Sequence, residues 1–242
     1  MVQCLSHRVE LAFKDAMKKA PLYSKVYSLM DELFKFYHKS AKQSAGLKSS
    51  FEALNITPCT PTRVGGTRWL GHTLTALNNI WKGYTAIVKH LSQVSVTTGQ
   101  SATQPKALYL LKLLRSNDVI TFAHFLTDVV AVLAQLSKAL QKRETCLYEV
   151  HQQLLATISN IKKFQTRPGP ELRKVQRPDG SFAGESLTGD TTQHSAQMPK
   201  LLTALVETLD RRFSDIDEGV LCATKLADMN AWPASLEDST NG

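Results

Sequence analysis

The sequence predicts a mainly α-helical protein, and three features support that prediction. Apolar residues recur at steps of three and four over most of the 242 positions, which is the spacing that places them on one face of an α-helix. Candidate strands are scarce, and the one at HLSQVSVTT has no partner strand. The apolar share of 43% is that of a globular chain, long enough for one large domain or two small ones.

The first 54 residues are expected to hold the first helices. The stretch VQCLSHRVEL alternates weakly between polar and apolar residues, as a strand that runs into a helix would. An amphipathic helix is predicted from Pro21, because proline fits the first turn of a helix, and the stretch SAGLKSS then interrupts its pattern. In residues 55–68, Pro58 and Pro61 exclude a regular helix, so we expect a Pro/Gly loop there.

Residues 69–165 carry the longest helical pattern in the chain. A first run of apolar residues extends over 69–91, and Pro105 can open a second helix after a polar break. Two long apolar helices follow, at 117–142 and 144–165. We expect these segments to form one helical domain.

The last part of the chain is less regular. Residues 166–196 are rich in Gly, Pro and polar side chains and lose the helical spacing, so we expect a flexible loop. Residues 197–232 are expected to be terminal helices, beginning with an amphipathic one. Residues 233–242 form a tail without core residues.

The net charge of +8 is concentrated in the first part of the sequence. Residues 1–90 hold 13 Lys and Arg against 5 Asp and Glu, whereas residues 91–242 hold 16 of each kind. A basic region is typical of a protein that binds a polyanion such as nucleic acid. A solvated, lysine-rich helix surface would give the same counts, and charge alone does not separate the two interpretations.

The sequence carries no sign of secretion or of a membrane span. The first twenty residues are charged where a signal peptide has its apolar segment, and no window approaches 18 uninterrupted apolar residues. The four cysteines are too far apart to form a disulfide framework, which indicates free thiols in a reducing compartment. We therefore expect no membrane partner.

Few residues have the pattern of a metal or catalytic site. Cys4 and His7 have the spacing of two zinc ligands, but a structural zinc site needs four, and no second pair follows at suitable spacing. We expect instead a buried thiol and a hydrogen-bonded imidazole with a structural role. The chain has no G-x-S-x-G, no P-loop and no G-x-G-x-x-G. These observations predict no metal, no cofactor, no small-molecule substrate and no catalytic residue.

Residues 63–72, RVGGTRWLGH, differ from the ordinary helical packing around them. Gly65 and Gly66 allow a sharp turn or a close approach of the backbone. Arg63 and Arg68 offer guanidinium groups to phosphate, and Trp69 can stack on a base. The alternative is that Trp69 is a core anchor at a helix start, with a solvated arginine beside it. The properties of these residues alone favour that alternative.

Two motifs resemble those of hAT-superfamily transposases. CLSHRVELAFKDA is similar to their C-x-x-H-x-L-x-L segment, and TRVGGTRWLGHTLTAL is similar to the T-R-W segment that follows it. The gap of about 60 residues between the motifs, with an amphipathic helix inside it, also fits. The stretch RVGGTRWLGH is especially similar to the corresponding sequence of domesticated vertebrate hAT proteins that carry zinc fingers ahead of a transposase-like region.

The resemblance implies an RNase H-like core interrupted by a large helical insertion. The chain would hold that insertion and a short N-terminal remnant of the α/β core, in residues 1–54. The family's two catalytic aspartates lie before the Cys-x-x-His segment and its glutamate lies after the insertion, so the resemblance implies that all three are absent. The chain is therefore not expected to be an enzyme.

The resemblance also assigns roles to single residues. Trp69 matches the family tryptophan that stacks on a flipped base, and Arg68 matches a basic position beside it. Cys4 and His7 match the pair that buttresses the active-site region. Gly71 stands where the family has Ser or Thr, so a hydroxyl contact would be lost.

We therefore expect a non-catalytic hAT-like chain that binds DNA weakly and without sequence preference through residues 1–90. The binding residues are expected to be Arg63, Arg68, Trp69 and Lys82. One alternative is a protein-interaction or dimerisation module that uses helices in 117–165. Another is a fragment without an independent role. The family relation and a modest basic loop, IKKFQTRPGPELRKVQR, indicate a nuclear location.

Overall fold

The computed structural model of the chain describes residues 5–66, 69–97, 103–141, 147–176 and 179–216. Within these ranges the protein is mainly helical, as predicted. The elements in chain order are α1 (Leu5–Met17), α2 (Pro21–His38), α3 (Ala41–Ala53), α4 (Trp69–Val96), α5 (Thr103–Leu114), α6 (Asn117–Ala139), α7 (Leu147–Lys163), α8 (Leu172–Val175), β1 (Ser181–Phe182), β2 (Glu185–Ser186) and α9 (Thr192–Asp215).

Helix α6 is the centre of the core. It packs against α1, α2, α4, α5, α7, α8 and α9. Because neighbours surround it, apolar residues occur on nearly all of its sides, and Phe122, Leu126 and Val130 are completely covered. By length and composition α6 could also cross a membrane, but most of it is buried inside the protein, and core helices meet the same criteria.

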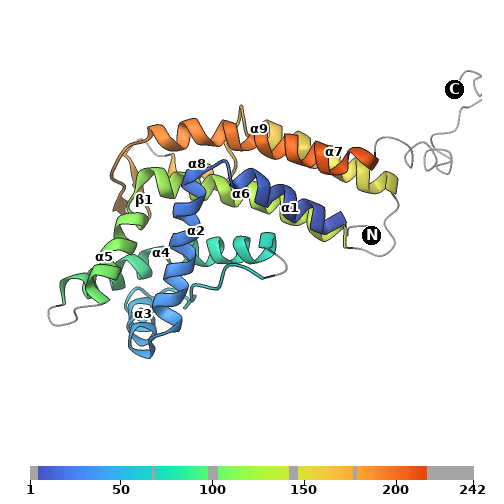
Figure 1. Cartoon of the computed structure of the whole chain (residues 1–242). Helices are drawn as coiled ribbons and strands as arrows, with labels where there is room; N and C mark the ends of the chain where they lie inside the picture. Colours follow the sequence, from blue (N-terminus) through green and yellow to red (C-terminus); the bar gives the residue numbers. More distant parts are fainter. Residues whose placement is uncertain (1–4, 67–68, 98–102, 142–146, 177–178, 217–242) are drawn as a thin grey trace, which may run out of the picture.

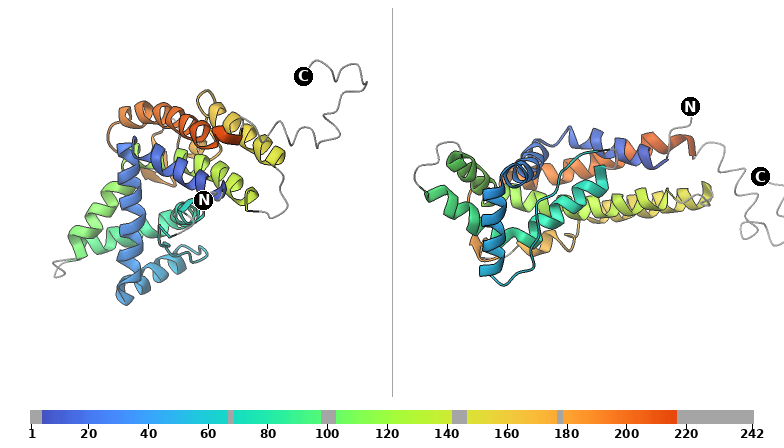
Figure 2. Two further views of the ribbon diagram at one scale, coloured as in Figure 1. Left: turned by 45° about the vertical axis from the view of Figure 1, so that its right-hand side comes forward. Right: turned by 90° about the horizontal axis from the view of Figure 1, so that it is seen from below.

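The helices form two groups that meet at α6. Helices α1, α6, α7 and α9 run in similar directions, while α2 turns away from them and leads to α3 (Figure 1). Seen from below, α1 lies beside α9, and α6 continues beside α7 (Figure 2). The first and last described helices are also joined by an ion pair between Arg8 and Asp215, with a distance of 2.5 Å.

Helix α1 occupies the stretch for which a strand was predicted. Residues Val9, Phe13 and Ala16 are buried at helical spacing, and this longer period outweighs the short alternation before it. Residues 5–53 form three helices, and the described part of this region contains no strand. The strand prediction was therefore wrong from Leu5 onward.

Two other stretches that were predicted to interrupt the helices are also helical. SAGLKSS lies inside α3, which Ser40 begins by accepting a hydrogen bond from a first-turn backbone N–H. Gly46 serves packing there, since a Cβ at that position would lie 2.3 Å from Nε2 of His90. HLSQVSVTT continues α4 as far as Val96. In both places tertiary packing overrides the modest helix propensity of Ser and Gly.

The segment 166–196 is more structured than its composition predicted. It contains α8, the antiparallel pair β1–β2 and the start of α9. The carboxylate of Asp128 on α6 accepts the backbone N–H groups of Glu171 (3.0 Å) and Leu172 (2.9 Å), which fixes the start of α8. The buried apolar residues of the segment are Leu172, Val175 and Phe182. These contacts attach it to the core, so the flexible-loop prediction was wrong for its described residues.

The last helix begins earlier than predicted. Helix α9 starts at Thr192 and contains Pro199, whereas the sequence suggested a start near residue 197. Its apolar face, which includes Leu205 and Leu209, is buried. The predicted helical region from 217 to 232 and the tail at 233–242 lie outside the described residues.

Candidate functional site

The predicted binding residues lie at the start of α4 and along its length. Trp69 is the first residue of α4 and is half-buried. Arg63 is exposed in the loop before it, and Lys82 is exposed more than three turns further along α4. Arg68 lies outside the described residues, as does Cys4. His7 is exposed on α1, and its expected structural role stays a prediction.

The loop before α4 packs against the surface of α4 itself. The side-chain amide of Asn79 donates to the Thr60 carbonyl oxygen (3.3 Å), and the Cys59 thiol donates to the Asn79 carbonyl oxygen (3.6 Å). Gly65 and Gly66 follow with φ angles of 110° and 112°, which other residues rarely adopt. Glycine is therefore favoured at both positions by the backbone conformation.

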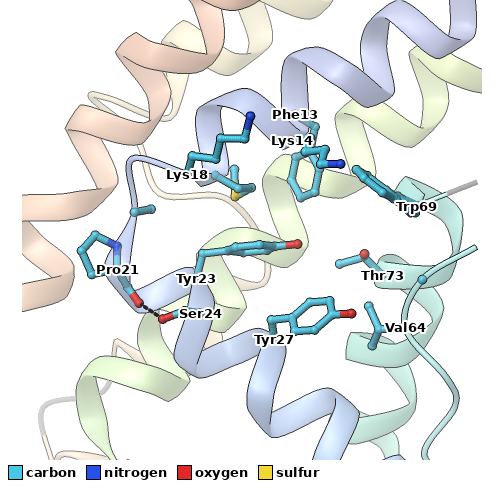
Figure 3. Close-up of a pocket in the computed structure, with 13 residues that line it drawn as sticks. Phe13, Lys14, Lys18, Pro21, Tyr23, Ser24, Tyr27, Val64, Trp69 and Thr73 are labelled. Atoms are coloured by element: carbon cyan, nitrogen blue, oxygen red, sulfur yellow. Dashed lines mark hydrogen bonds between the residues drawn. The ribbon is translucent and has the colours of Figure 1, made fainter.

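A pocket of about 670 Å³ lies beside Trp69, between α1, α2 and the start of α4 (Figure 3). Its volume is in the range of sites for small organic groups. Lys14, Lys18 and Tyr27 are exposed, so the pocket opens to the surface. Thr73 and Val64 close its α4 side (Figure 3).

Four aromatic rings line this pocket. Phe13 and Tyr23 pack edge to face at 5.9 Å between centroids, and Tyr27 lies 6.2 Å from Tyr23. Burial raises the pKa of Tyr23 to about 12, so its hydroxyl stays protonated at neutral pH and can donate a hydrogen bond. The fourth ring is Trp69. Such a wall of rings accepts a flat aromatic group by stacking or by edge contacts.

Two lysines add positive charge to the same pocket. The Lys14 ammonium lies 4.3 Å from the centre of the Trp69 ring, a cation–π arrangement, and no ion pair joins Lys14 to a described carboxylate. Lys18 lies 3.1 Å from Asp15, whose carboxylate also binds Arg212. No described acidic side chain lines the pocket. The site therefore combines aromatic surface with a cation that is available to an anion.

Glu10 on α1 binds the backbone at the start of α4. Its carboxylate Oε2 accepts the backbone N–H of Leu70 at 3.0 Å, and the side chain is buried between the two helices. Burial raises the pKa of the Glu10 carboxyl, and the amide groups of Leu70 and Trp69 act against this effect. The nearby imidazoles of His7 and His72 also favour the charged form.

A second polar cluster lies further along α4, where half-buried Trp81 meets α6. The Trp81 ring stacks on His124 at 3.9 Å, and its Nε1 donates to Thr127 Oγ1 at 3.0 Å. His124 is completely buried, and neither of its ring nitrogens has a hydrogen-bond partner. Burial lowers its pKa to about 3, so this histidine is neutral at physiological pH. The cluster serves the packing of α4 against α6.

Chemistry of other kinds finds little support in the described residues. They contain no group of three or more His, Cys, Asp and Glu side chains that could hold a metal ion. Cys59 is half-buried, and burial raises the pKa of its thiol despite the nearby charge of Lys82. A thiol with a raised pKa is a poor nucleophile at neutral pH.

The residues that sequence reasoning missed come from α1 and α2. Phe13, Tyr23 and Tyr27 were not singled out in the sequence, because their meeting with Trp69 depends on how α1, α2 and α4 cross. Glu10 carried a signal that could have been used, because it is an acidic residue next to the apolar face of α1 and is buried. Lys14 follows it by one helical turn.

A scan against protein-family models gives no match to this chain, and no solved structure matches it.

Proposed function

We propose that the chain is a non-catalytic, hAT transposase-like protein that binds nucleic acid through the pocket beside Trp69. The observation that carries the proposal is the pocket itself, where the rings of Tyr23, Tyr27 and Trp69 meet two lysines near the surface and the buried ring of Phe13 lies behind them. An aromatic wall with adjacent cations suits an unpaired base together with its phosphate. The binding is weak and independent of sequence, because the pocket presents rings and charges rather than an array of groups that read base edges.

The charge distribution supports the same ligand. The excess of positive charge lies in residues 1–90, the part of the chain that builds the pocket. Arg63 and Lys82 are exposed on the loop and helix that continue from Trp69, and they provide further contacts for the phosphate backbone. Such contacts release counterions, so the affinity falls steeply with salt concentration.

The origin of the chain is proposed from its motifs. The Cys-x-x-His and T-R-W segments lie in the order and at the spacing of hAT transposases, and a mainly helical chain is the kind of structure that the family's insertion would have. The proposed role is binding, because the pocket presents aromatic rings and lysines. A nuclear location follows from the same relation.

The alternative of a helical interaction module has less support in the structure. It needs an exposed apolar stripe on residues 117–165, yet α6 is buried and the described apolar face of α7 packs inward. Of the large apolar side chains in this region, Leu155 is exposed, which is ordinary for a protein surface. Pairing through these helices would require them to leave the core.

The test is a salt titration of binding to two fluorescent DNA probes, a hairpin with an unpaired loop and a plain duplex. We expect the hairpin to bind more tightly, and both affinities to fall between about 50 and 200 mM salt. Trp69→Ala should weaken hairpin binding about tenfold, because stacking on one base contributes roughly 1–3 kcal/mol. Duplex binding should change much less.

The matched control is Lys162→Ala, which removes a positive charge from an exposed position on α7, away from the pocket. Its effect should be small and the same for both probes. The proposal is wrong if neither probe binds at low salt, or if folded Trp69→Ala binds the hairpin as the wild type does.

A further inference from the structure

Glu10 occupies an unusual position for a carboxylate. It is buried, and its hydrogen-bond partner is the backbone of Leu70, which lies 60 residues away in the sequence. The amide of Trp69 also faces it. The first N–H groups of a helix have no partner inside that helix, so a side chain from elsewhere can satisfy them. Glu10 does this for α4 from α1.

Glu10 and Lys14 act on the same residue from one helix. They are four positions apart on α1, so they lie on one face of it. Glu10 meets the backbone at the start of α4, while Lys14 lies over the indole ring of Trp69. Phe13, between them in the sequence, lines the pocket. Helix α1 therefore contacts the backbone at the start of α4 and the Trp69 ring, and it also supplies part of the pocket wall.

We propose that Glu10 is a positioning residue for nucleic-acid binding: it anchors the first turn of α4 to α1 and thereby holds the Trp69 ring at the mouth of the pocket. This proposal rests on the proposed function of that pocket for its effect on binding. Glu10 itself touches no ligand, because it lies below the first turn of α4 and does not line the pocket. Its effect is transmitted by the position of Trp69.

Charge and position predict opposite results for removal of Glu10. If Glu10 acted only as a negative charge near the site, its loss would strengthen the binding of a polyanion. If it positions Trp69, its loss weakens binding although the protein becomes more basic. Glu10→Gln keeps an oxygen that can accept the Leu70 N–H and removes only the charge. Glu10→Ala removes both, and Glu10→Asp keeps the charge on a shorter side chain.

The experiment combines hairpin binding with fluorine NMR of protein labelled with 5-fluorotryptophan. The chain has three tryptophans, and Trp69→Phe identifies the Trp69 signal. We expect Glu10→Ala and Glu10→Asp to shift or broaden the Trp69 signal while the Trp81 signal stays in place, which also shows that the core is folded. Both variants should bind the hairpin about fivefold or more weakly, the usual scale for loss of a helix cap. Glu10→Gln should leave the signal in place and bind as tightly as the wild type or more tightly.

Two results would overturn the positioning role. One is a Trp69 signal that is unchanged in folded Glu10→Ala and Glu10→Asp. The other is hairpin binding by Glu10→Ala that equals or exceeds that of the wild type. If the wild type binds no DNA, the proposed function fails, while the NMR comparison in the free protein still decides whether Glu10 positions Trp69.

Discussion

Two tryptophans on one helix have opposite surroundings. Trp69 opens α4 beside a surface pocket, with the charged ammonium of Lys14 over its ring. Trp81, twelve residues later, is also half-buried, but it stacks on the buried, neutral ring of His124, and its Nε1 is hydrogen-bonded. The same side chain therefore serves packing in one place and leaves aromatic surface available in the other. A displaceable cation over the ring and a surface pocket beside it distinguish the binding position from the packing position.

The largest expected difference between the two tryptophans is in stability. Trp81→Ala should lower the free energy of unfolding by about 3–5 kcal/mol, because it empties a packed site and removes the partner of Thr127. Trp69→Ala should cost about 1 kcal/mol or less, since one side of its ring faces the pocket. Urea denaturation followed by circular dichroism measures both. Equal losses would show that Trp69 is a core anchor as well.

The buried imidazole of His124 should also make the stability of the protein depend on pH. The pKa of His124 is lowered to about 3 in the folded protein, so between pH 6.5 and 3 the unfolded state binds a proton that the folded state does not. Stability is therefore lost as the pH falls through this window, by at most about 1.4 kcal/mol per pH unit from this group. Burial raises the pKa values of Glu10 and Asp128, so at pH values above their ordinary pKa the folded state holds protons that the unfolded state has released. These two groups therefore favour the folded state as the pH falls, which opposes the effect of His124.

His124→Phe isolates the contribution of the histidine. The variant keeps a ring against Trp81 and Phe182 but cannot take up a proton. The difference in unfolding free energy between wild type and variant should change steadily below pH 6.5, in the sense that the wild type becomes relatively less stable. A difference that is constant from pH 7 to pH 5 would contradict a neutral His124.

The smallest expected effect belongs to the cation over Trp69. Lys14→Met should weaken hairpin binding two- to threefold and reduce the salt dependence by about 0.7, the value for one phosphate contact with a single strand. Stability should change by less than about 1 kcal/mol, because the cation–π contact is exposed. Lys162→Met, with the same change of charge on α7, should alter neither property. Identical behaviour of the two variants would remove Lys14 from the site.

The helical class, the need for glycine at positions 65 and 66 and the start of a helix at Trp69 could all be predicted from the sequence, because each depends on neighbours close in the chain. The pocket could not, since Phe13, Tyr23 and Trp69 come together only through the crossing of three helices. The role of Asp128 was hidden for the same reason. It caps a helix that lies about forty residues further on, in a segment whose composition resembles a loop.

The pairing of α1 with α9 has a consequence for synthesis on the ribosome. The face of α1 that carries Arg8 and Asp15 meets α9 through Asp215 and Arg212, so this contact forms after nearly all of the described chain has been made. At ordinary rates of translation, α9 follows α1 by roughly 10–40 s. Through that interval the helix that supports the pocket lacks one of its main partners, and the face of α1 that α9 later covers stays exposed.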